Sequence, residues 1–233
     1  MFSENPASKN LSGLLKYLAQ TSGGAASRLP SLHEIARELG ISIASLREQL
    51  EVARVMGLVE IRPKTGLRKL DYSLSPILKQ SLAYGILVNE SLFQEFSDLR
   101  KHLETVYWME AVNLLDEDDQ NYLKTLVKSA KAKLHALPIQ IPHLEHRELH
   151  LSIYSKLGNL FVHDLLEVYW DMYENLGLNQ YTDLNYLEGV WDYHERMVNA
   201  ICEGQMEAGY KALIDHMALI NQRATRKPTG NFE

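Results

Sequence analysis

Cysteine and long apolar runs are what this sequence has least of. The single cysteine among 233 residues, Cys202, excludes an internal disulfide framework, and its apolar helical surroundings favour a buried thiol over a reactive one. No apolar run reaches the roughly 18 residues that a membrane-spanning helix needs, and the polar N-terminus lacks the apolar region of a signal peptide. We therefore predict a cytoplasmic protein with no membrane partner.

Sequence patterns of common enzyme classes are also missing. There is no glycine-rich phosphate-binding loop, and the order of the serines, histidines and aspartates assigns no catalytic triad. His194-Glu195 begins like a zinc-protease motif, but Val198 and Asn199 stand where its second histidine is needed. We predict that the chain is not an enzyme, and a metal-dependent enzyme remains an alternative.

Charge is unevenly distributed along the chain. Residues 1–74 hold ten Lys/Arg and seven Asp/Glu, a balance of +3, whereas residues 75–233 hold fourteen and twenty-three, a balance of −9. The net charge of −6 therefore hides an N-terminal part that can approach a polyanion and a remainder that a polyanion repels.

Residues 29–55 have the pattern of two short helices joined by a turn. Ser31 can cap the first helix, Gly40 can end it in the left-handed conformation, and Ser42 can cap the second. Such a pair is a helix-turn-helix, whose second helix enters the major groove of DNA. In that second helix we expect the core side to carry Ile43, Leu46, Leu50, Ala53 and Val55, leaving Ser42, Ser45, Arg47 and Gln49 available outside the core.

The next segment has the pattern of a two-stranded wing. Residues 58–61 and 67–70 alternate like strands, and 62–66 reads as a turn. Four cations fall within eight residues, a density suited to phosphates, although such charges can also merely solvate a hairpin: Arg62, Lys64, Arg68 and Lys69. We predict a winged helix-turn-helix domain over residues 1–72.

Beyond a short tether at 71–76 the pattern is helical throughout. The fold class we predict is mainly α, with an all-helical bundle of six or seven helices over residues 77–228. The candidate helices are 77–90, 92–115, 117–136, 143–157, 160–176, 183–203 and 205–226. The 92–115 helix has an apolar stripe that we expect to face the core, made of Leu92, Phe96, Leu99, Leu103 and Val106.

Four of the nine histidines have a spacing that could hold one metal ion. His146 and His150 lie at i, i+4 and share a helix face, while His194 and His216 lie ten residues before and twelve after Gly204, at similar heights if the last two helices are antiparallel. Imidazoles in a helical bundle suit a divalent metal such as zinc or nickel. The alternative to a shared metal site is that these histidines are unrelated, each either exposed to solvent or satisfied in the core.

Together these residues resemble the GntR family of bacterial transcription regulators, in its FadR-like branch with an FCD effector domain, over residues 10–226. In the first half the resemblance rests on Leu29-Pro30-Ser31, Glu34-Ile35-Ala36, Leu39-Gly40-Ile41-Ser42, Leu46-Arg47-Glu48 and Gly57-Leu58-Val59. In the second half it rests on Leu99-Arg100 with Leu103-Glu104, Glu148-Leu149-His150 with Gly158-Asn159, and His194 with Ile201, Gly204 and His216.

The resemblance implies a homodimer that binds double-stranded operator DNA and responds to a small organic carboxylate. We expect a repressor; an acyl-coenzyme A bound without metal is the alternative effector. The family's metal site uses one Asp and three His. The resemblance matches the three histidines to His150, His194 and His216, and it places His146 at the position of the Asp. Arg100 would be a cationic partner of the effector, or else form a surface salt bridge with Asp98 or Glu104.

The resemblance also assigns the DNA contacts. Ile43 and Ala44 replace the Arg and Thr that the family often has after the recognition-helix cap, so one bidentate guanine contact is absent. The residues that we expect to contact DNA are His33, Ser42, Ser45, Arg47, Arg62, Lys64 and Thr65.

Overall fold

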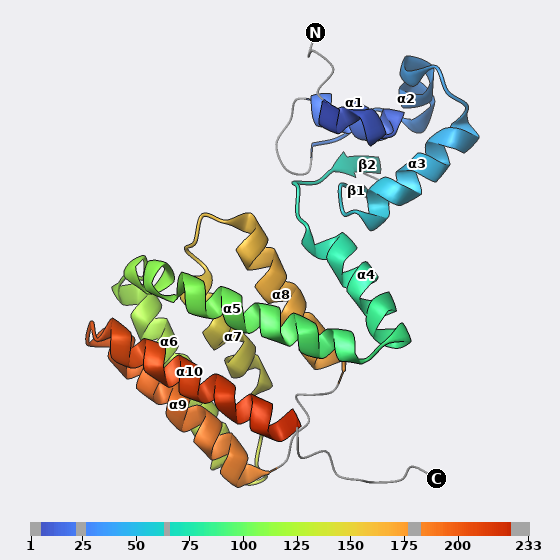
Figure 1. The fold of residues 1–233 in the computed structure, drawn as a ribbon. Helices are drawn as coiled ribbons and strands as arrows, with labels where there is room; N and C mark the ends of the chain where they lie inside the picture. Colours follow the sequence, from blue (N-terminus) through green and yellow to red (C-terminus); the bar gives the residue numbers. More distant parts are fainter. Residues whose placement is uncertain (1–5, 22–26, 63–65, 177–182, 225–233) are drawn as a thin grey trace, which may run out of the picture. The chain divides into compact units, whose positions relative to one another are not determined.

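We describe the protein from a computed structural model, which covers residues 6–21, 27–62, 66–176 and 183–224. The chain forms two compact units, 1–85 and 86–233 (Figure 1). The division falls inside helix α4, later than the 71–76 tether that the sequence suggests, and our domain limits stay a prediction. The mainly helical fold class is confirmed.

The N-terminal unit contains the predicted helix pair and strand pair. Its elements are η1 (Pro6–Asn10), α1 (Gly13–Gln20), α2 (Leu32–Leu39), α3 (Ile43–Val55), β1 (Val59–Arg62) and β2 (Gly66–Lys69). The short 3-10 helix η1 precedes α1 along the chain.

Local capping bonds explain where α2 and α3 begin and end. The Ser31 hydroxyl accepts from the backbone N–H of Glu34, whose carboxylate accepts from the backbone N–H of Ser31, which is a capping box. Gly40 ends α2 at φ 65°, and the Ser42 hydroxyl caps α3 by accepting from the backbone N–H of Ser45 at 3.1 Å.

The core of this unit joins the helices to the wing. The two strands of the wing are antiparallel, with Val59 opposite Lys69. On the other edge of β2, the backbone oxygen of Leu67 accepts from the backbone N–H of Leu29. Val55, which we expected in the core, is 43% exposed because it lies two residues, roughly 200° around the helix, from the buried Ala53. The buried core residues are Leu14, Leu18, Leu29, Ile35, Ala36, Leu46, Leu50, Ala53, Val59 and Leu67.

The remaining elements are the seven helices that periodicity predicts, with ends within three residues of the expected ones. They are α4 (Ser75–Val88), α5 (Ser91–Asn113), α6 (Glu117–Leu134), α7 (His143–Tyr154), α8 (Leu160–Asn175), α9 (Leu184–Cys202) and α10 (Met206–Ala224). None of those helices, nor any other in the described part of the chain, has the length and apolar character needed to cross a membrane.

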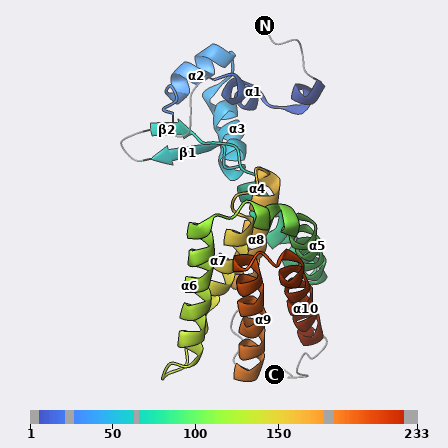
Figure 2. The ribbon, with the colours of Figure 1, turned by 90° about the vertical axis from the view of Figure 1, so that its left-hand side faces the viewer.

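The helical unit is organised so that α7 lies among the others. Helix α7 packs against α5, α6 and α8, while α9 packs against α6 and α10, and α10 returns to α5. Figure 2 shows α6, α9 and α10 running along nearly parallel axes. The turn between α9 and α10 contains Gly204 at φ 70° and makes these two helices an antiparallel pair.

Helix α5 turns a different face to the core than we expected. Leu99 is 44% and Val106 76% exposed, so two members of the expected apolar stripe face outward. The buried face instead carries Phe93, Phe96, Arg100, Glu104, Trp108, Ala111 and Val112.

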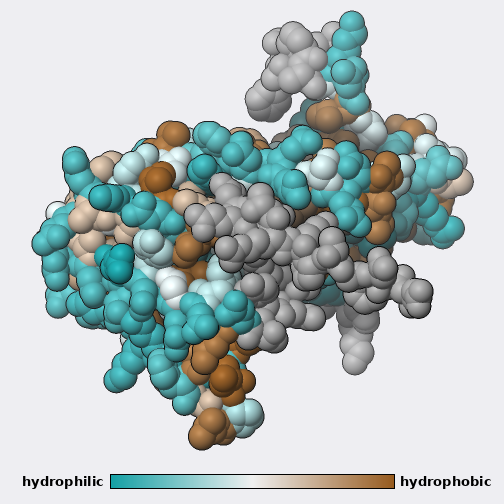
Figure 3. Space-filling view, turned by 60° about the horizontal axis from the view of Figure 1, so that its bottom comes forward, coloured by the Kyte–Doolittle hydropathy of each residue, from teal (hydrophilic) through white to brown (hydrophobic). Residues whose placement is uncertain are grey.

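On the face of the molecule in Figure 3, exposed apolar residues form separate patches between polar ones. Cys202, expected to be buried, is partly exposed.

We predict that Gly57→Ala destabilises the N-terminal unit more than Gly40→Ala. Both glycines have positive φ, at 71° and 65°, so both substitutions incur the backbone cost of roughly 1–2 kcal/mol. Only at Gly57 would the added Cβ meet another residue, since it would lie 2.5 Å from Cγ of Pro76. The measurement is hydrogen exchange of core amides in residues 14–67. If both variants lose the same amount of protection against exchange, close packing of Pro76 on Gly57 is contradicted.

Candidate functional site

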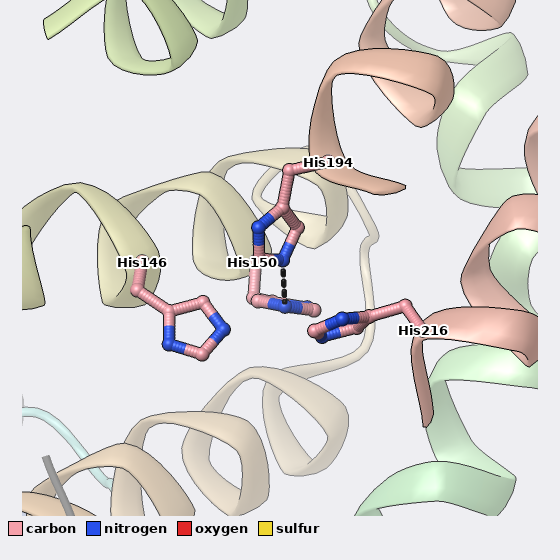
Figure 4. Close-up of side chains that lie close together, drawn as sticks. All are labelled: His146, His150, His194 and His216. Atoms are coloured by element: carbon pink, nitrogen blue, oxygen red, sulfur yellow. Dashed lines mark hydrogen bonds between the residues drawn. The ribbon is translucent and has the colours of Figure 1, made fainter. Parts of the chain in front are cut away.

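Four histidines from three helices converge inside the helical unit (Figure 4). His146 and His150 come from α7, His194 from α9 and His216 from α10. Their ring centroids are 4.3–5.9 Å apart, and each offers one nitrogen such that the four nitrogens lie within 4.8 Å of one another. The structure therefore brings together all four histidines that the sequence singled out.

Several ring nitrogens of this four-histidine cluster are buried without a partner. Nε2 of His150 lies 3.1 Å from Nε2 of His194, which is the hydrogen bond drawn in Figure 4. Nε2 of His146, Nδ1 of His194 and both nitrogens of His216 are buried and bond to no other group. An unsatisfied buried polar group costs about 1–3 kcal/mol, and a cation shared by the lone pairs removes that cost. These unpartnered nitrogens make the four-histidine cluster a fitting ligand set for a divalent metal ion.

Burial also keeps the cluster in the form that binds metals. Loss of solvation lowers the pKa of His146, His150, His194 and His216 well below the ordinary value. Each imidazole is consequently neutral near pH 7 and keeps one lone pair, as a metal ligand requires.

Aromatic rings enclose the four-histidine cluster. The Trp170 ring lies 4.7 Å from His146 and 5.1 Å from His150, and the Trp191 ring lies 4.8 Å from His194, all measured between centroids. Both indoles are buried, and Nε1 of Trp170 has no hydrogen-bond partner. These walls exclude water and lower the local dielectric, which strengthens every electrostatic contact inside.

A buried ion pair lies against the cluster. Arg100 Nε donates to Oε1 of Glu104 at 2.8 Å, and both side chains are almost fully buried. Of the two partners that the sequence offered for Arg100, the structure shows Glu104 and not Asp98. The expected surface location is wrong, because the pair is in the interior. The guanidinium also stacks 4.9 Å from the Tyr169 ring and places Nη2 3.0 Å from Nδ1 of His150.

We assign the ion pair as ionised. Burial opposes the charge of Arg100, but Glu104 and Tyr169 outweigh it and raise the guanidinium pKa. Burial raises the pKa of Glu104, and the charge of Arg100 opposes that rise. A neutral Glu104 would leave a buried guanidinium without a counter-charge, so the charged pair is the favoured state.

Glu104, Trp170 and Trp191 are the site residues that sequence reasoning missed. The i, i+4 spacing of Arg100 and Glu104 signalled a salt bridge, but nothing in the sequence placed it beside a histidine. Trp170 reaches the cluster from α8 through packing between helices, which periodicity does not reveal. Trp191 lies at i, i+3 from His194 on α9, a spacing that the sequence contains.

A groove of about 340 Å³ lies elsewhere, between α6 and α9. Lys124, Lys128 and Glu195 line it, and Lys131 on its wall is already paired with Asp192 and Glu195. None of the four histidines borders this groove, so we do not assign the site there.

The residues expected to contact DNA that fall within the described ranges are at the surface or partly exposed. His33, Ser42 and Arg47 are exposed, and Ser45 is partly exposed. Arg62 is exposed and pairs with Glu60 at 2.7 Å, while Lys64 and Thr65 lie outside the described residues.

Gln49 has a structural role that we did not expect. Its Oε1 accepts from the backbone N–H of Leu14 at 2.8 Å, which ties α1 to α3. The Gln49 side chain is therefore committed to the fold of the N-terminal unit rather than available outside its core.

Comparison with known proteins gives consistent matches. Residues 95–219 match the FCD domain family. The chain is 22% identical over 200 residues to the HTH-type transcriptional regulator LutR of Bacillus subtilis (strain 168), covering 82% of this chain and 88% of that protein. The solved structure of Streptococcus agalactiae GntR is 21% identical, with a TM-score of 0.66 over 90% of this chain and 96% of that one.

The ion pair generates a prediction about stability. Glu104→Gln should lower the free energy of unfolding by about 3–5 kcal/mol because it leaves Arg100 buried and unpaired, and adding Arg100→Met should restore part of the loss. Glu51→Gln, in the exposed pair with Arg54, should cost less than about 1 kcal/mol. Urea denaturation with a chelator present, followed by circular dichroism of the helices of both units, measures each value. Equal costs at Glu104 and Glu51 would refute the interior location.

Proposed function

Because the chain belongs to the FCD-domain branch of the GntR family of transcription regulators, we propose that the four-histidine cluster binds one divalent metal that anchors a small carboxylate effector. In this proposal the protein is a dimeric repressor whose N-terminal unit binds operator DNA. The effector changes the affinity of the dimer for that DNA. The observation that carries the proposal is the convergence of four neutral imidazoles, three of them fully buried, with ring nitrogens of His146, His194 and His216 left without a partner.

The composition of the cluster favours zinc or nickel. His146, His150, His194 and His216 supply neutral nitrogen ligands, which suit borderline ions better than magnesium or calcium. When bound, the ion supplies a Lewis-acidic attachment point for an effector carboxylate. Histidines scattered over the surface would favour the alternative effector, an acyl-coenzyme A bound without metal, but the four histidines lie together.

Arg100 is our proposed cationic partner for the effector. Its Nε is used by Glu104, but its guanidinium faces the four-histidine cluster through Nη2. A buried guanidinium forms strong charge-assisted bonds to a carboxylate, since it is already desolvated and held in place by Tyr169.

The proposed DNA surface is the exposed side of α2 and α3 together with the wing. Arg47 and the caps Ser42 and Ser45 would meet bases and phosphates, and His33 and Arg62 would lie on the flanks, with Lys64 and Thr65 at the wing. A dimer places two such surfaces on the half-sites of a palindrome. An effector acts on this arrangement only through different affinities for the DNA-binding and non-binding states.

We predict that the purified protein holds about one metal ion per chain and that His150→Ala/His194→Ala loses it. The matched control is His102→Ala/His135→Ala, which also removes two histidines but at exposed positions on α5 and after α6. Elemental analysis after zinc loading and desalting measures the content. Equal metal in both double variants would eliminate the site.

We predict that Arg47→Ala weakens binding to the operator about 5- to 150-fold, as expected for a lost base contact worth roughly 1–3 kcal/mol. Arg54→Ala is the control, because Arg54 lies at the end of the same helix and is paired with Glu51. Gel shifts on promoter DNA of the chain's own and neighbouring genes, with competitor DNA present, measure both. Similar affinities for Arg47→Ala and wild type would contradict the proposed surface.

A further inference from the structure

Two groups of opposite character reach the same nitrogen of one histidine. Nδ1 of His150 lies 3.3 Å from Oε1 of Glu104 and 3.0 Å from Nη2 of Arg100. Glu104 can only accept a hydrogen bond when ionised, and Arg100 can only donate one. Of these two neighbours, only Glu104 can accept from Nδ1 when this nitrogen carries a proton, and only Arg100 can donate to it when it carries a lone pair.

The other nitrogen of His150 faces the cluster. Its Nε2 lies 3.1 Å from Nε2 of His194, which comes from a different helix, and 3.4 Å from Nη2 of Arg100, which is closer to Nδ1. A neutral imidazole carries one proton, so if Nε2 offers its lone pair to a cation, the proton is on Nδ1. In that tautomer Nδ1 must donate, and of its two neighbours Glu104 is the one that accepts.

We propose that Glu104 is a positioning residue that selects the metal-binding tautomer of His150, and that Arg100 competes for the same nitrogen and releases it when metal binds. The inference rests on the metal site proposed above. It also gives that site a route to the effector, because the Nη2 group released from His150 becomes available to an anion.

The surroundings of Glu104 suit this role. The Tyr154 hydroxyl donates to its backbone oxygen at 2.7 Å, and its Oε2 is buried with no partner, so the carboxylate has unused accepting capacity beside the ring. The proposed ligand set contains no carboxylate of its own. A carboxylate that accepts from a metal-bound histidine fixes the ring orientation and raises the basicity of the ligand nitrogen.

A purely structural ion pair makes a different prediction from a competing pair. If Arg100 and Glu104 only support the fold, removing either one loosens the cluster and weakens metal binding. If they compete for Nδ1, the two substitutions have opposite signs: Glu104→Gln removes the charged acceptor, whereas Arg100→Met removes the competitor and a repelling charge.

The experiment measures zinc affinity by competition with a chromophoric chelator. We expect Glu104→Gln to weaken zinc binding about 10- to 100-fold and Arg100→Met to bind zinc at least as tightly as wild type. Glu110→Gln, an exposed residue on the same helix, should match wild type. Weakening by both Glu104→Gln and Arg100→Met, or by neither, overturns the inference.

Nitrogen-15 NMR of zinc-loaded wild type provides a second readout that does not need a folded variant. We expect His150 with a proton on Nδ1 and zinc on Nε2; the reverse assignment overturns the inference even if Glu104→Gln fails to fold. If wild type binds no zinc at all, the proposed metal site fails instead. If it binds zinc but the variants lack opposite effects, only the role of Glu104 fails.

Discussion

The cost of burying polar groups is the constraint on which the helical unit depends. Three histidines, one arginine and one glutamate are almost fully enclosed by α5, α7, α8, α9 and α10. Each isolated group would oppose folding by several kcal/mol if it stayed charged or unpaired, so their positions must satisfy one another. The Arg100–Glu104 pair does so by mutual charge, whereas burial keeps the imidazoles neutral but leaves several of their nitrogens without a partner. The four-histidine cluster, built from α7, α9 and α10, carries the part of this cost that the protein alone does not remove.

The two units use charge in opposite ways. In the N-terminal unit the cations Arg47 and Arg62 remain at the surface, where their charge can act on a polyanion, and an apolar core supports them. In the helical unit the cation Arg100 is inside, stacked on aromatic rings, where the low dielectric strengthens its contacts with nearby groups. The uneven charge along the sequence, +3 against −9, fits this division of roles.

Local signals were readable from the sequence, and contacts between helices were not. The caps Ser31 and Ser42 act within three residues, and the i, i+4 spacing of His146 and His150 needs only one helix. His194 and His216 could be matched because one turn at Gly204 relates their helices. The face of α5 was misassigned because periodicity treats charged residues as external, whereas Arg100 and Glu104 compensate each other inside and leave Val106 outside. Trp170 joins the site only through packing between helices, which no spacing encodes.

The family resemblance places His146 where an Asp ligand is expected, and this difference would change the electrostatics of the proposed metal site. A carboxylate in the ligand set would cancel one unit of a divalent charge directly, whereas a neutral imidazole cancels none. The negative charge that remains beside the cluster is on Glu104, and it is separated from the convergent nitrogens by the ring of His150 and shared with Arg100. Because Coulomb attraction falls with distance and Arg100 offsets it, a bound cation here would keep most of its positive charge. Such a residual charge would attract an anion most strongly, so in the proposed function the histidine at position 146 would bear on the class of effector.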